Sequence, residues 1–180
     1  MNAQSSNLRL VRICLFAALI AALGLIPRID IPIAAGVPIT AQTLGVMLAG
    51  LMLGARAGAL SVLLFLFVVA LGMPFLAGGR GGLAVFFGPT AGFLFGWIPG
   101  AFLSGLLGRS TGPLSFLRGL AGAFAGGVIA VYACGIAWLA IVAGLGWKAA
   151  MIATAVFLPG DVLKSLLAAA IAARAGEFGK

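Results

Sequence analysis

An acidic and a basic residue stand three positions apart inside an apolar run near the end of the chain. Asp161 and Lys164 lie in the segment ATAVFLPGDVLKSLLAAAI, although the 180 residues include only three acids against eleven bases. Placing a charged group at the centre of a membrane helix costs about 2.5 to 3.5 kcal/mol, so such groups usually mark a ligand site or a transport pathway. Residues at i and i+3 also share one helix face and can pair. Because charges within a membrane are rarely kept for structure alone, we favour two groups that face a polar ligand, with a structural ion pair as the alternative.

The composition indicates that lipid surrounds most of this chain. Apolar residues make up 63% of it and charged residues 8%, whereas soluble domains have about 45 to 50% and about 25%. The net charge of +8 comes from bases scattered singly, which predicts a membrane topology signal and no nucleic-acid partner. Cys14 and Cys134 lie in apolar runs without metal or disulfide spacing, so we expect no metal site and no cofactor.

Hydropathy predicts one all-α integral membrane domain, residues 1–180, built as a bundle of six transmembrane helices. Only helices and closed barrels satisfy the backbone in lipid, and the apolar runs here are continuous rather than alternating. The predicted spans are about 11–27, 40–55, 57–73, 84–108, 117–144 and 149–174.

The basic residues predict the orientation of the bundle. With a cytoplasmic N-terminus, the cytoplasmic segments carry Arg9, Arg12, Arg56, Arg109, Arg118, Arg174 and Lys180, and the outer loops carry Arg28, Arg80 and Lys148. This division favours cytoplasmic N- and C-termini, because loops on that side are enriched in Lys and Arg.

Small residues recur at helical spacing in several places, including two of the predicted helices. Gly88, Gly92, Gly96 and Gly100 form one stripe along the predicted fourth helix, and the first helix has two interleaved pairs in Ala17, Ala18, Ala21 and Ala22. Helices in lipid associate by close backbone approach over such residues. Internal packing, dimerisation and docking to a separate membrane subunit all remain open.

The glycine cluster Gly78 to Gly82 flanks Arg80 on the predicted outer side, where Gln42 also lies. Glycine backbone can adopt positive φ and approach a ligand closely. We therefore expect a lid-like or re-entrant segment, with a flexible connection as the alternative.

Catalytic motifs are not convincing in this chain. Residues 108–112, GRSTG, match the G-x-S-x-G pattern, but the sequence has no histidine to serve as base. No phosphate-binding G-x-x-x-x-G-K-[ST] loop is present either. We expect a carrier or a solute receptor rather than an enzyme, with no catalytic residues.

Four motifs in order resemble the BioY family, the biotin-specific substrate-binding (S) components of energy-coupling factor (ECF) transporters. They are VPITAQTL (37–44), GMPF with GGRGGL (72–83), GPTAGF (88–93) and PGDVLK (159–164), and the resemblance extends over roughly residues 10–174. The chain departs from the family at Ala91-Gly92-Phe93, where Gly-Gly-Tyr is usual. A tyrosine hydroxyl is therefore missing at position 93.

The resemblance implies a multi-pass protein of the prokaryotic cell membrane that takes up biotin. Members work with a transmembrane coupling protein and a pair of ABC-type ATPases, which agrees with the missing phosphate-binding loop, and some are thought to transport alone. Docking in the family uses small residues of the first helix, here the set Ala17, Ala18, Ala21 and Ala22.

The resemblance also implies roles for individual side chains. The ureido ring of biotin has two N–H donors, for which Asp161 is the expected acceptor, and the valerate carboxylate needs a cation. Lys164 is expected to meet it, with Arg80 in the lid above. The rest of the predicted site is Gln42, Thr40, Thr90, Phe93 and Gly82; helix capping by the threonines and exposure of Gln42 are the alternatives.

Three other functions stay open at this stage. They are an S component for a different small vitamin, a proton-coupled secondary carrier with Asp161 as relay, and a non-transport membrane scaffold. In the scaffold, the charged pair would tolerate joint replacement by apolar residues.

Overall fold

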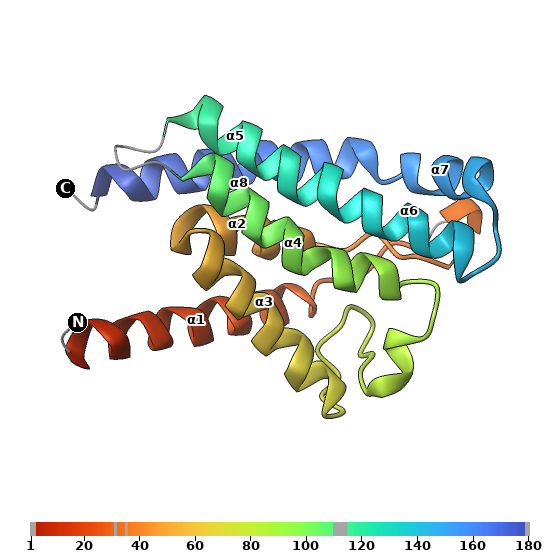
Figure 1. Ribbon diagram of the computed structural model, residues 1–180, viewed down its shortest axis with the longest axis horizontal. Coiled ribbons are helices and arrows are strands. Elements are labelled where there is room, and N and C mark those ends of the chain that lie inside the picture. The colour runs from red at the N-terminus through yellow and green to blue at the C-terminus, as the bar shows by residue number, and fades with distance from the viewer. Residues whose placement is uncertain (1–2, 31, 35, 110–114, 179–180) are drawn as a thin grey trace.

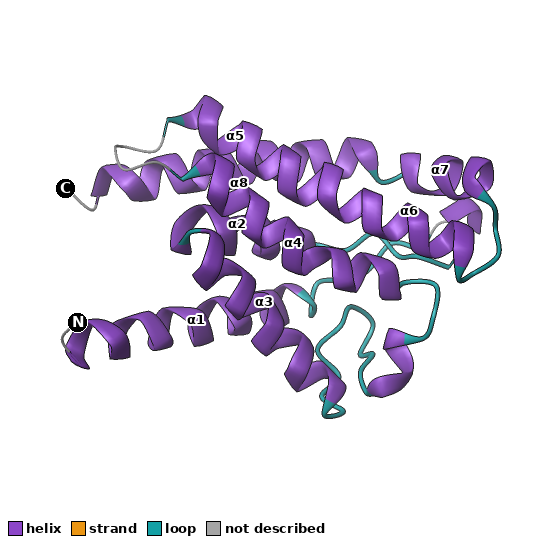
Figure 2. Ribbon diagram, viewed as in Figure 1, coloured by secondary structure: helices purple, strands orange, loops and turns teal. Residues whose placement is uncertain are grey.

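The computed structural model describes residues 3–30, 32–34, 36–109 and 115–178. Residues 110–114, which include most of the GRSTG motif, and Lys180 lie outside the described residues. The described part is helical, with only two isolated β-bridges and no strand (Figures 1 and 2). The expected all-α architecture is confirmed.

Eight α-helices and three shorter helical segments follow one another along the described chain. The α-helices are α1 (Ala3–Leu23), α2 (Gln42–Leu53), α3 (Ala55–Ala70), α4 (Ala91–Gly108), α5 (Phe116–Phe124), α6 (Val131–Ile141), α7 (Trp147–Ala155) and α8 (Leu158–Phe178). The shorter segments are the 3₁₀ turns η1 (Pro32–Ala34) and η2 (Leu83–Phe86) and the π-helix η3 (Ala125–Ala130).

Three helical stretches are long and apolar enough to cross a membrane. They are Ser6–Leu23 of α1, the whole of α4, and the continuous α5–η3–α6 stretch Phe116–Ile141. α7 and α8 pass the same test together but are bent by 53° at their junction, and α2 and α3 are apolar but shorter. Each predicted span contains helix, although the bounds differ. α1 runs from Ala3 to Leu23 instead of 11–27, and two further differences have a local cause in the sequence.

Both differences lie next to a proline. The fourth span was expected from residue 84, but α4 begins at Ala91 after a separate turn, because the residue before Pro89 is kept out of the helical region. The sixth was expected to be continuous, but the chain breaks before Pro159, which lies in the first turn of α8. Proline is tolerated there because the first N–H groups of a helix have no partner within it.

α4 is the central helix and packs closely through its glycines. It contacts α2, α3, α5, η3 and α6. A Cβ atom at Gly92 would collide with Trp138, and one at Gly96 would press on Val131. Gly100 faces the carbonyl of Gly126 in η3. Gly92, Gly96 and Gly100 therefore serve internal packing, whereas Gly88 lies before α4 with open space around it and does not belong to the stripe.

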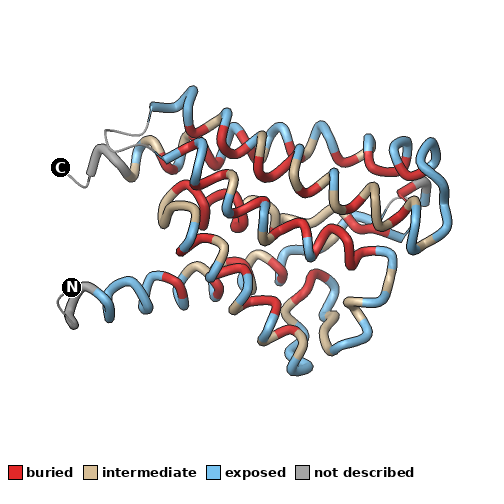
Figure 3. Tube along the Cα trace, in the orientation of Figure 1, coloured by how far each residue is buried: buried red, intermediate tan, exposed pale blue. Residues whose placement is uncertain are grey.

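α1 lies at the edge of the bundle and is mostly exposed (Figure 3). Only 17% of its span is buried, and it contacts α2 and α3. Its N-terminal end lies at the same end of the molecule as the C-terminal end of α8 (Figure 1). One long face of α1 is thus free to meet lipid or another protein.

Candidate ligand-binding pocket

A cavity of about 60 Å³ lies between α2, α4, α6 and α8, and the loops before α2 and after α3 close it. Seven of the eight predicted binding residues line it: Thr40, Gln42, Arg80, Thr90, Phe93, Asp161 and Lys164. Gly82 does not. With φ of 81° it lies in a turn, where its N–H donates to the carbonyl of Val69 at 2.8 Å.

The break between α7 and α8 positions the acidic side chain of the pocket. Asp161 lies in the first turn of α8, and its side chain is 7% exposed. The N-terminal end of a helix carries a partial positive charge that stabilises a carboxylate. Broken helices of this kind recur at solute sites within membranes, where they direct a helix end at a polar group.

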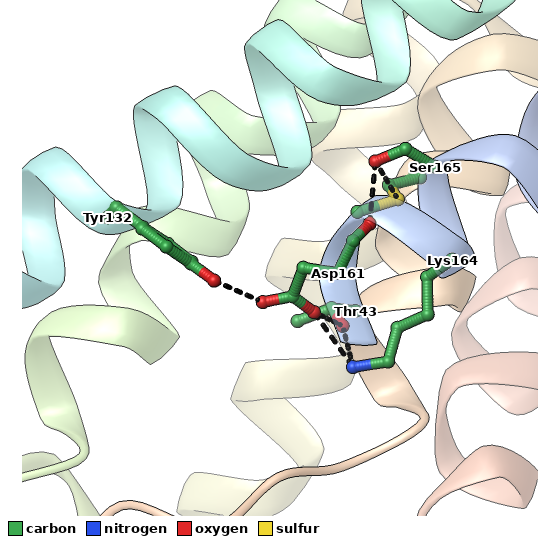
Figure 4. A network of polar contacts seen from close by, with 6 residues as sticks. Thr43, Tyr132, Asp161, Lys164 and Ser165 are labelled. Carbon is green, nitrogen blue, oxygen red and sulfur yellow. Dashed lines mark hydrogen bonds and ion pairs between the residues drawn. The ribbon is translucent and has the colours of Figure 1, made fainter. Parts of the chain in front are cut away.

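The carboxylate of Asp161 is the centre of a polar network (Figure 4). Its Oδ1 accepts from Lys164 Nζ at 2.8 Å and from Thr43 Oγ1 at 3.2 Å, and its Oδ2 accepts from the Tyr132 hydroxyl at 2.8 Å. Lys164 Nζ also donates to Thr43 Oγ1 at 3.1 Å. The two interpretations of the Asp161–Lys164 spacing are therefore compatible: the residues form an ion pair and also line the pocket.

Tyr132 and Thr43 were not among the predicted site residues. Tyr132 is the only tyrosine in the chain, and a lone phenol within an apolar span was the signal available for it. It is the second residue of α6, which follows directly on η3. A π-turn adds one residue to a helical turn, and each added residue rotates the side chains that follow by about 100° around the helix axis. The pocket thus contains a tyrosine hydroxyl from α6, although position 93 lacks one.

Phe93 provides an apolar wall. Its ring meets that of Phe157 edge to face, with centroids 6.1 Å apart. Thr90 is buried but does not cap α4, and the residue that precedes α2 is Ala41 rather than Thr40. The capping alternatives for both threonines are wrong.

Gln42 is 1% exposed, which rules out the solvent-exposed alternative. Its Nε2 donates to the carbonyls of Ile20 and Phe75, at 3.1 and 3.0 Å, and its Oε1 accepts from the Ala77 N–H at 3.0 Å. Both amide hydrogens are therefore already used. Gln42 joins α1, α2 and the loop that follows α3, and so holds this loop over the pocket.

The loop that carries Arg80 is closed by its own backbone. Leu76 and Arg80 exchange two hydrogen bonds, at 3.0 and 3.2 Å, and Arg80 Nε donates to the Ala77 carbonyl at 3.3 Å. Gly78 and Gly79 have φ of 80° and 69°, the conformation that this tight turn requires. Burial lowers the pKa of the Arg80 guanidinium; Arg28 lowers it further and Asp30 opposes the shift. Arg80 still enters the pocket wall as a cation, since arginine is protonated at any physiological pH.

Known proteins similar to this chain cover nearly all of it. The sequence model of the BioY family matches residues 1–179. The chain belongs to the BioY family. The biotin transporter BioY of Rhizobium etli is 51% identical over 166 residues, 89% of this chain and 88% of the relative. That of Rhodobacter capsulatus is 50% identical over 175 residues, 91% of this chain and 90% of the relative.

A solved structure supports the same assignment. The S component for biotin from an ECF-type ABC transporter superposes with a TM-score of 0.87 at 32% sequence identity, covering 98% of this chain and 95% of that one. This similarity shows that the two proteins share one fold over nearly all of their length.

The predicted docking alanines of this BioY family member divide into two sets. Ala17 is 8% exposed and belongs to the core, and Ala21 packs against that core. Ala18 and Ala22 face outward and are exposed. The first pair serves internal packing, and only the second is accessible to another protein.

Proposed function

We propose that this BioY family member captures biotin from outside the prokaryotic cell and carries it across the cell membrane as the S component of an ECF-type transporter. The observation that carries the proposal is the Asp161–Tyr132–Lys164–Thr43 network in a pocket that also contains Arg80. Relatives at up to 51% identity are biotin transporters, and the superposed structure is an S component for biotin.

The hydrogen-bonding capacity of the pocket suits the ureido ring of biotin. An ionised carboxylate offers about four acceptor positions, and Asp161 uses three of them for Thr43, Tyr132 and Lys164. One position is left for a ureido N–H. The hydroxyls of Tyr132 and Thr43 can rotate to accept from the second N–H or donate to the ureido carbonyl.

The charge of the pocket suits the carboxylate of biotin. Lys164 and Arg80 carry two positive charges against the one negative charge of Asp161, so a monoanionic ligand restores neutrality. Lys164 is already neutralised by Asp161 at 2.8 Å, whereas Arg80 has no ion pair with a described acid. We therefore propose that Arg80 takes the larger share of the ligand carboxylate and Lys164 the smaller.

The pocket must widen to admit this ligand. Its volume of about 60 Å³ is below the roughly 300 to 1,000 Å³ of sites for drug-sized molecules. The tip of the loop around Arg80 is the part that can move outward, because Gly78 and Gly79 are exposed there, whereas Leu76 and Ala77 before them are buried in the bundle. Biotin would then hold it closed through the Arg80 side chain.

For the topology, we propose six spans with both termini in the cytoplasm. The spans are α1, α2, α3, α4, α5–η3–α6 and α7–α8, and the pocket lies toward the outer side. The partners we propose are a transmembrane coupling protein and a pair of ABC-type ATPases, which dock on the outward-facing Ala18 and Ala22. Association between copies of this chain on the same face is the alternative.

Calorimetric titration of the purified full-length protein with biotin and with biotin amide tests the ligand assignment. We expect both to bind, and Arg80→Met to weaken biotin more than the amide because only biotin has the negative charge. If Lys164→Met instead weakens biotin more than the amide, Lys164 is the partner of the ligand carboxylate. Tighter binding of another vitamin from a panel would overturn the biotin assignment, and no heat with any vitamin would favour the scaffold.

Uptake in proteoliposomes tests the transport mechanism and the docking face. With coupling protein and ATPases present, Ala18→Leu should reduce uptake while biotin affinity stays unchanged, because added bulk blocks close helix approach. Ala17→Leu is the control, since it should instead destabilise the fold. Uptake that proceeds without ATPases and collapses with an uncoupler would favour the proton-coupled carrier.

A further inference from the structure

A groove lined by four arginines lies at the end of the molecule opposite the pocket. Its volume is about 420 Å³, within the range of ligand sites. Three elements form its walls: α1, the α2–α3 turn and the C-terminal end of α4. The lining residues are Leu8, Arg9, Arg12, Leu53, Gly54, Ala55, Arg56, Ala57 and Arg109. None of these described lining residues is acidic.

The positive charges of this arginine groove are not balanced by the described part of the protein. The two ion pairs among described side chains are Arg28–Asp30 and Lys164–Asp161, both away from the groove. Arg109 Nη1 donates to the carbonyl of Met52 at 2.8 Å, where the last turn of α2 carries partial negative charge. This contact fixes Arg109 in the wall without neutralising it, so the groove is suited to an anion.

The surface next to the groove is apolar and exposed. On α1, Leu8 is 56% exposed, Val11 54% and Leu15 61%, and on α3 Leu60 is 45% exposed. These side chains lead from the arginines toward the middle of the bundle, along the exposed faces of α1 and α3. An anionic group with long hydrocarbon chains therefore fits this part of the molecule better than a small water-soluble anion.

We propose that the arginine groove binds the phosphate of an anionic phospholipid, whose acyl chains lie along α1 and α3. Guanidinium groups bind phosphate oxygens in pairs of parallel hydrogen bonds, and basic pockets between membrane helices are typical sites for anionic headgroups. The site would hold α1 to the α2–α3 turn through the lipid. It is separate from the biotin pocket and does not depend on the proposed function.

Native mass spectrometry of the full-length protein in an uncharged detergent tests this site. We expect saturable binding of phosphatidylglycerol and at least tenfold weaker binding of phosphatidylcholine. Each basic side chain near an anionic lipid contributes about fivefold in affinity, so Arg12→Gln/Arg56→Gln should weaken phosphatidylglycerol binding roughly 25-fold. The charge-matched control is Arg118→Gln/Arg174→Gln, two arginines that lie outside the groove lining, and it should change affinity less than threefold. An unaltered unfolding temperature without lipid would show that each double variant is folded.

Several results would overturn the proposal. Equal loss in the two double variants would mean diffuse charge attraction, and equal binding of the two lipids would exclude a site for net negative charge. Displacement of phosphatidylglycerol by inorganic phosphate at equal concentration would identify a site for free anions. If the groove variants keep lipid affinity but lose assembly with the coupling protein, the arginines contact an acidic protein surface instead.

Discussion

The pocket and the arginine groove show two ways in which one membrane protein accommodates charge. They lie toward opposite ends of α4, a helix about 27 Å long for its 18 residues. In the pocket, Asp161 and Lys164 are almost fully buried and neutralise each other. In the groove, four arginines of the same sign lie together at the surface.

The difference follows from depth. A charge in the low-dielectric interior needs a partner within the protein at all times, because it cannot be hydrated. A charge at the level of the lipid headgroups is hydrated and screened, so its partner can come from outside. Removing a charge should therefore destabilise the pocket strongly and the groove hardly at all.

The largest effect is expected from Asp161→Ala. This change leaves Lys164 buried without its partner, and breaking a buried pair typically costs about 3 to 5 kcal/mol of stability. The free energy of unfolding in detergent measures it. Arg56→Gln in the groove is the control and should stay within about 0.5 kcal/mol.

Joint replacement separates the contribution of the pair to stability from its contribution to binding. Asp161→Leu/Lys164→Met should recover most of the lost stability, since apolar residues of similar size often replace a buried pair without loss. It should nevertheless abolish biotin binding. A double variant that still binds biotin would place the ligand elsewhere.

Gln42→Leu is expected to have the second largest effect. It leaves the buried N–H of Ala77 and two backbone carbonyls without their partner, which costs about 1 to 3 kcal/mol. The loop after α3 loses its connection to α2, so biotin should dissociate faster in stopped-flow chase experiments. Ser61→Ala is the control, because this buried hydroxyl donates to the Ala57 carbonyl of its own helix and lies outside the pocket wall. An unchanged dissociation rate would mean that the loop does not control ligand release.

The sequence predicted the charged residues of the pocket better than its neutral ones. Asp161, Lys164 and Arg80 were found because charges are rare in and around apolar runs. Tyr132 was missed because the direction of its side chain depends on the π-helix before it, and π-helices leave no periodic signal in an apolar sequence. The structure shows what accompanies that segment: Gly126 lies against the carbonyl of Gly100, and Gly127 against Met47.

The order of the helices was predictable from hydropathy, but two details of the fold were not. Pro159 gave a signal for the break between α7 and α8, although a proline alone does not distinguish a broken span from a kinked one. The division of the alanines into Ala17 with Ala21 and Ala18 with Ala22 depends on which side of α1 meets α3, and a helix apolar on all sides does not reveal this.

Tyr132→Phe should have an intermediate effect. It removes one neutral donor to the buried carboxylate and leaves the Asp161–Lys164 pair in place. Hydrogen bonds to charged groups contribute about 1.5 to 3 kcal/mol, so biotin affinity should fall at least about tenfold by calorimetry. Phe93→Tyr in the same background should not restore it, because ring 93 packs edge to face on Phe157 rather than on Asp161. If biotin affinity recovered in that double variant, a phenol at position 93 could replace the phenol at position 132.

The smallest effect is expected from salt, and it distinguishes the two sites most directly. The four arginines of the groove are exposed to solvent, so salt screens the repulsion among them. Raising the ionic strength from about 0.01 to about 0.15 M shortens the screening length from about 30 to about 8 Å, which should weaken this repulsion. Without lipid, the parent protein should gain about 0.2 to 1 kcal/mol in unfolding free energy, the scale of exposed charge interactions. Arg12→Gln/Arg56→Gln should lose most of this gain because two of the four repelling charges are gone, whereas Tyr132→Phe should keep it. Salt screens the buried pair in the pocket only weakly. The contradicting result would be a salt dependence that disappears in Asp161→Leu/Lys164→Met but remains in the groove variants. In that case the pocket, and not the groove, would be the part of the molecule whose charge is open to solvent.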